Sequence, residues 1–151
     1  MGALAMAIHN DVRAVYEYLT SQVLPGADRP TVTYGQIERE TGVPIGEYGG
    51  YIGQVLGEIS RRCSDRRLAP LTSIFINATD GIPGSGYFVE MAQMLQRGNP
   101  ARWRIDLGIE RWDQRPTPRG FDKDLERWNY RQMIEENQRA VWAQTDWPQS
   151  I

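Results

Sequence analysis

A short, weakly apolar helix ahead of a longer, glycine-containing one is the feature that most constrains this chain. The stretch from Thr31 to Gly42 reads TVTYGQIERETG, and Ile37 is its only firm apolar anchor. Thr33 followed by Gln36 matches a capping box, and Gly42 suits a left-handed C-cap. A helix with so little apolar surface needs neighbours to hold it, so the stretch predicts the support helix of a helix-turn-helix.

The helices expected on either side each carry one apolar face. From Asn10 to Leu24 apolar residues recur at helical spacing, with Asn10 as the cap and a Pro-Gly pair as the stop. After the turn VPIGEYGG, a longer helix is expected from about Tyr48 to Ser64. Its apolar face consists of Ile52, Val55, Leu56, Ile59 and Cys63.

The longer helix contains more glycine than helices normally do. Gly50, Gly53 and Gly57 fall on one stripe, and each interior glycine costs about 1 kcal/mol relative to alanine. Two interpretations stay open: close packing against a neighbouring helix, or close approach of the backbone to a ligand such as a DNA phosphate.

Downstream the pattern changes to strand and turn. Residues 72–77 are β-branched and aromatic, which predicts a strand, and the Asp-Gly and Pro-Gly pairs that follow are turn chemistry. Residues 87–89 either return as a strand or begin a helix. Two helices followed by this strand and the turn 78–86 are typical of a winged helix.

The last third differs from the rest. Residues 103–109 alternate in polarity, which predicts a half-buried strand, and a helix is expected from Phe121 to about Trp142. All five tryptophans lie after residue 102, and we expect them to pack this tail onto the first part. The sequence thus predicts a single α+β domain: a winged-helix-like core at 9–90 and a Trp-rich extension at 91–151.

Residues 9–90 resemble the C-terminal domain of alkylguanine-DNA alkyltransferases and alkyltransferase-like proteins. DVRAVYEYL matches the family's first helix, TYGQI with Gly42 and Pro44 matches its second helix and turn, and Gly53 matches its recognition-helix glycine. The resemblance implies a winged helix that binds the DNA minor groove. Tyr34 matches the family tyrosine that rotates the target phosphate.

The reactive motif of that family is missing. Where the family reads P-C-H-R-V, this chain reads APLTSIFIN, and its single cysteine and histidine, Cys63 and His9, lie upstream. The family arginine that replaces a flipped base is matched by Gly50 or Tyr51, so base flipping does not carry over. We expect no alkyl transfer, no enzyme activity, and neither metal nor cofactor.

Charge gives a mixed indication. The net charge of -2 and pI of about 5.5 count against a generic nucleic-acid binder, although a local basic surface suffices. The densest basic cluster is RRCSDRR, which holds Arg61, Arg62, Arg66 and Arg67. At a helix end it either stabilises the helix dipole or binds phosphates.

Two functions follow from these observations. The first is non-catalytic DNA binding, with the helix from Tyr48 in a groove. Its expected contacts are Tyr34, Gly50, Tyr51, Gln54, Arg61, Arg62, Arg66 and Arg67. The second is a protein partner: an acidic winged-helix scaffold that inhibits or adapts another machine, for instance a phage-encoded inhibitor of a bacterial defence complex. Arginines that share a face with Tyr34 would favour DNA, whereas arginines paired with acids would favour the protein partner.

The sequence also bears on location. No apolar run approaches the roughly 20 residues of a membrane span, and the first residues lack the basic and long apolar regions of a signal peptide. A lone cysteine excludes an internal disulfide and a cysteine-rich zinc site. We therefore expect a cytoplasmic protein with no membrane partner.

Overall fold

The computed structural model describes residues 2–24, 27–79, 81–84, 87, 90–91 and 130–151, and the following account is confined to them. The elements are α1 (Ala3–Gln22), β1 (Val32–Thr33), α2 (Tyr34–Thr41), a 3-10 turn (Glu47–Gly49), α3 (Gly50–Asp65), a second 3-10 turn (Leu71–Ile74), β2 (Phe75–Ile76) and α6 (Tyr130–Ala143). The described part is thus mostly helical with one small two-stranded sheet, which agrees with the α+β class. None of its helices is long and apolar enough to span a membrane.

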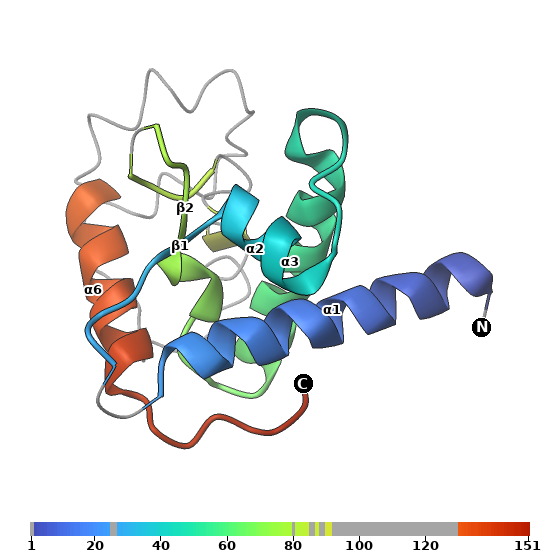
Figure 1. The fold of residues 1–151 in the computed structure, drawn as a ribbon. Helices are drawn as coiled ribbons and strands as arrows, with labels where there is room; N and C mark the ends of the chain where they lie inside the picture. The colour runs from blue at the N-terminus through green and yellow to red at the C-terminus, as the bar shows by residue number, and fades with distance from the viewer. Residues whose placement is uncertain (1, 25–26, 80, 85–86, 88–89, 92–129) are drawn as a thin grey trace.

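Helix α1 forms one long wall of the core and packs against α2 and α3 (Figure 1). Val12, Val15, Tyr16 and Leu19 are fully buried and follow the helical spacing seen in the sequence. The helix begins at Ala3, however, well before the predicted start at Asn10. The residues before Asn10 include good helix formers such as alanine, leucine and methionine, so propensity extends the helix beyond the part that packs.

Helix α2 confirms the expected support helix in detail. Gln36 N–H donates to Thr33 Oγ1 at 3.3 Å, and Thr33 N–H donates to Gln36 Oε1 at 2.8 Å, which completes the capping box. Gly42 ends the helix with a φ of 74°, and Ile37 is its buried anchor. The short helix is therefore fixed by its two ends and by one apolar residue.

Helix α3 begins at Gly50, two residues after the predicted start, because a 3-10 turn precedes it. The glycines around this entry have a structural cause. Gly46 and Gly49 have φ values of 82° and 73°, a region that side chains rarely adopt. A Cβ on Gly46 would also lie 2.7 Å from the Cβ of Tyr51.

The strand predicted at 72–77 is wrong over most of its length. Leu71–Ile74 form a 3-10 turn, and only Phe75–Ile76 form a strand, which pairs in parallel with Val32–Thr33. The β-propensity of this stretch reflects its burial, because residues 71–75 are all buried on several sides. Tyr87 and residues 90 and 91 are helical, so of the two options for this segment the helix is observed.

The C-terminal part is described from Tyr130 onward. The strand predicted at 103–109, and the first part of the helix predicted at 121–142, lie outside the described residues; the second part is α6. This helix packs on the 3-10 turn at 71–74, and the chain after it passes along α1 (Figure 1). Trp142 Nε1–H donates to Pro30 O at 3.0 Å and Tyr16 donates to Pro148 O, so this tail is fixed to the first part as expected.

Candidate functional site

A cavity of about 580 Å³ opens between α2, α3 and the residues after β2. Tyr34 forms part of one wall, and Glu90 part of another. The side contributed by α3 consists of Gly49, Gly50, Gly53, Leu56, Gly57 and Ser60. The residues that seemed out of place in a helix therefore border one hollow.

The glycines of α3 differ in what surrounds them. A Cβ added to Gly50 or Gly53 would meet no described atom within 4 Å. A Cβ on Gly57 would lie 3.1 Å from Glu90 Oε1 and 3.5 Å from an Arg61 guanidinium nitrogen. Gly57 is thus explained by close contact with two side chains. For Gly50 and Gly53 the described residues offer no helix packed against them, which favours the ligand interpretation.

Tyr34 is held from two sides at the edge of the cavity. Its ring meets Phe75 edge-on, with 4.2 Å between centroids and 84° between planes. A Cβ on Gly84 would lie only 2.5 Å from the Tyr34 hydroxyl oxygen. The turn that carries Gly84 is closed by two hydrogen bonds, Asn77 N–H to Ile82 O and Gly81 N–H to Asn77 O, both 2.8 Å. The described part of the predicted turn 78–86 thus packs back on Tyr34.

The inner wall contains two buried hydroxyl groups. Ser60 of α3 and Thr72 both line the cavity, and their oxygen atoms lie 2.7 Å apart. They are 2% and 3% exposed, so each satisfies the other in a setting where an unpaired hydroxyl would be costly.

An ion-pair network runs along the outer side of α3. Arg61 donates to Glu58 Oε2 at 2.7 Å and to Glu90 Oε1 at 2.9 Å, and Arg62 donates to Glu58 Oε1 at 3.0 Å. The hydrogen bond from Arg61, reinforced by Arg62, lowers the pKa of Glu58 against the opposing effect of burial. Burial alone would lower the pKa of Arg61, but the hydrogen bond to Glu58 and the charge of Glu90 raise it.

The residues predicted to contact DNA do not gather on one surface. Tyr34 and Gly50 line the cavity, and Gln54 is exposed on α3. Tyr51 faces α1, where its hydroxyl donates to Asp11, and the resulting pKa of Tyr51 is raised to about 12.

The predicted arginines lie apart from that cavity group, except for Arg61 beside Gly57. Arg62 also contacts Nδ1 of His9 at 2.8 Å, and Arg66 donates to the carbonyl of Ser150 at 2.8 Å. Arg67 is exposed in a left-handed conformation with a φ of 57°.

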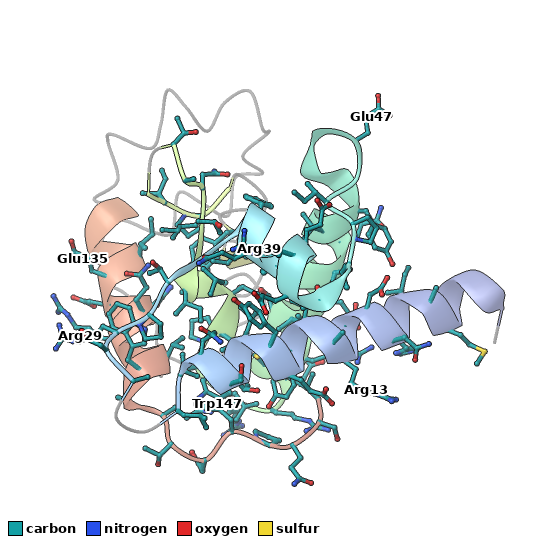
Figure 2. All side chains as sticks on the ribbon, in the orientation of Figure 1. Arg13, Arg29, Arg39, Glu47, Glu135 and Trp147 are labelled. Atoms are coloured by element: carbon teal, nitrogen blue, oxygen red, sulfur yellow. The ribbon has the colours of Figure 1, made fainter. Side chains whose placement is uncertain are left out.

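Three further arginines, Arg13, Arg29 and Arg39, lie at separate places on the surface (Figure 2). Of these, Arg29 lies 5.9 Å above the ring of Trp142. Neither these three nor the RRCSDRR arginines share a face with Tyr34.

Several cavity residues have no signal in the sequence. Phe75 is expected only as part of a strand, Gly84 only as part of a turn, and Glu90 has no expected role. Glu90 and Arg61 are separated by 29 positions, so no local spacing pattern links them. Only the tertiary fold brings these residues together.

Cys63 and the acidic residues offer no reactive centre in the described ranges. Burial raises the pKa of the Cys63 thiol to about 12, so it carries no thiolate at neutral pH. No group of three or more His, Cys, Asp or Glu among the described residues could hold a metal ion.

Scans against protein-family models, curated proteins and solved structures each gave no match. The resemblance to alkyltransferase-like proteins therefore rests on its sequence motifs.

Proposed function

We propose that the protein is a non-catalytic protein-binding module, an adaptor or inhibitor, whose partner docks over the cavity between α2 and α3. Its scaffold would be of the winged-helix type, with α2 and α3 as the helix-turn-helix and the turn 77–84 as the wing. A cytoplasmic location fits this role.

The observation that carries the proposal is the pairing of the arginines with acids. Arg61 and Arg62, half of the basic cluster, are bound to Glu58 and Glu90. A DNA phosphate that approached this side of α3 would meet two carboxylates and would have to displace them from their guanidinium partners. Ion pairs of this exposure are weak individually, but the carboxylates would remain as repulsive neighbours of the phosphate.

Glu90 strengthens the same argument from inside the cavity. Among the described residues that line it, Glu90 carries the only acidic or basic side chain. A single carboxylate disfavours an anionic ligand and is compatible with a neutral or cationic group from a protein.

DNA binding is the second candidate, because a specific observation favours it. Gly50 and Gly53 leave the backbone of α3 open beside Tyr34, which would allow the close approach that a DNA backbone needs. Such binding would use few free arginines, so its affinity would depend only weakly on salt concentration.

Gly53→Leu tests the proposal, since the new side chain would extend into the cavity. Gly35→Leu is the matched control: Gly35 is an exposed helical glycine of α2 that does not line the cavity, and a Cβ there meets no described atom. Leucine is the better helix former by about 1 kcal/mol, so both variants should fold. Thermal unfolding verifies this.

The assay is quantitative affinity capture from bacterial lysate with nuclease added. We expect wild type and Gly35→Leu to retain a common protein that Gly53→Leu loses. Equal capture by all three variants would contradict the proposal. Titration of a fluorescent duplex at low salt tests the second candidate, which requires binding that Gly53→Leu weakens and Gly35→Leu does not.

A further inference from the structure

We infer that the cavity accepts the guanidinium group of an arginine side chain of the partner protein, with Glu90 as its carboxylate ligand. This inference rests on the proposed protein-binding function and names the chemical group that would enter the site.

The first reason is the charge of the cavity wall. The Glu90 side chain is only 14% exposed, and it is the only acidic or basic group among the described lining residues. A carboxylate that is largely shielded from water interacts more strongly with a cation than an exposed one does. The described wall offers no cation that could hold a phosphate or carboxylate of a ligand.

The second reason is the aromatic lining. Tyr34 and Phe75 both border the cavity. A guanidinium group is planar, is more weakly hydrated than an ammonium group, and stacks on aromatic rings. These properties favour arginine over lysine, because the ammonium of lysine would lose more hydration on entering a partly apolar space.

The third reason is that Glu90 already binds one guanidinium group. Arg61 reaches it across Gly57, with 2.9 Å between the nitrogen and Oε1. A carboxylate has about four lone-pair sites, so a second guanidinium can bind the same group. Arg61 is also held by Glu58 at 2.7 Å, which would keep it in place if a second cation drew Glu90 toward the cavity.

The size of the space agrees with this occupant. An arginine side chain is long and narrow, and a cavity of about 580 Å³ leaves room for its aliphatic part as well as its head. Leu56 and Ile45 on the wall would contact that aliphatic part.

The test uses two capped tripeptides, acetyl-Gly-Arg-Gly-amide and its citrulline counterpart, which has nearly the same shape but no charge. Amide chemical shifts of the full-length protein report binding, and Gly50 and Gly53 mark the cavity. We expect the arginine peptide to shift these signals saturably and to bind at least about tenfold more tightly than the citrulline peptide, as a charge-assisted pair requires. Equal affinities, shifts confined to other regions, or no shifts would overturn the inference.

Two charge-removing variants make the test specific. Glu90→Gln should reduce the affinity of the arginine peptide to that of the citrulline peptide. Glu58→Gln is the matched control: it also removes a carboxylate partner of Arg61, but Glu58 does not line the cavity. Its preference for arginine should remain. If both variants lose the preference equally, a general loss of negative charge explains it and the assignment to Glu90 is wrong.

The outcome can be separated from that of the proposed function. Loss of the captured protein in Gly53→Leu, together with failure of the tripeptides to bind, would leave the proposed function standing and remove the arginine assignment. Tighter binding of spermidine than of the arginine peptide would instead assign the cavity to a free polyamine and overturn the inference.

Discussion

Helix α3 has two unlike faces. Toward α1 and the core, Ile52, Val55 and Ile59 are fully buried, and Tyr51 adds a hydrogen bond to Asp11. Toward the cavity, Gly53 has no side chain and no described neighbour within 4 Å of where one would begin. One face uses side-chain volume to stabilise the fold, whereas the other gives up helix propensity and leaves a hollow. The second face is therefore explained by what must approach it rather than by stability.

The largest contrast should appear when both faces are changed to alanine. Ile59→Ala removes buried volume, and we expect it to lower the free energy of unfolding by about 2–5 kcal/mol. Gly53→Ala adds a methyl group in open space and removes backbone freedom from the unfolded chain, so it should raise that energy by up to about 1 kcal/mol. Denaturant unfolding of both variants measures the difference.

The sign for Gly53 is the informative part of that comparison. A loss of stability in Gly53→Ala would mean that the position is filled in solution, and the cavity face would then be a packed face like the other. A gain, combined with weakened ligand capture, would separate the two roles of the helix.

A smaller effect is expected where the two faces meet, at Ser60 and Thr72. Ser60→Ala leaves the Thr72 hydroxyl buried without the partner that the structure gives it, and we expect a loss of about 1–3 kcal/mol. The double variant with Thr72→Val removes both hydroxyls at similar shape and should cost less than the single one. If denaturation shows additive losses instead, the two hydroxyls do not depend on each other and a further partner satisfies them.

The sequence predicted the features that depend on neighbours along the chain. Thr33 and Gln36 identified the start of α2, Gly42 its end, and the periodic apolar residues identified the buried faces of α1 and α3. Each of these signals spans only a few residues, because capping and helical periodicity are local.

The features that depend on tertiary contacts could not be predicted. Residues 71–74 look like a strand because β-branched and aromatic residues suit any buried site, and only the packing of α6 on them decides otherwise. The contact of Gly84 with Tyr34 and the pairing of Arg61 with Glu90 join distant segments. The composition revealed a basic cluster, but only the fold reveals that its first two arginines are neutralised.

The smallest expected effect tests that neutralisation through pH. The hydrogen bonds from Arg61 and Arg62 lower the pKa of Glu58 below its ordinary value of 4.5 in the folded state. A lowered pKa means that the folded state holds fewer protons than the unfolded state in this range. The contribution of Glu58 to stability is therefore complete above about pH 4.5 and is lost as the pH falls through the folded-state pKa.

Glu58→Gln should consequently show a shallower fall of unfolding free energy below that pH than the wild type, measured by denaturant unfolding across a pH series. The Glu58 side chain is 32% exposed, so the difference should be modest and should shrink as salt is added. Identical pH profiles would mean that the ion pairs on the outer side of α3 are too weak to hold the arginines. Arg61 and Arg62 would then be free to bind phosphate, and the balance between the two candidate functions would shift toward DNA.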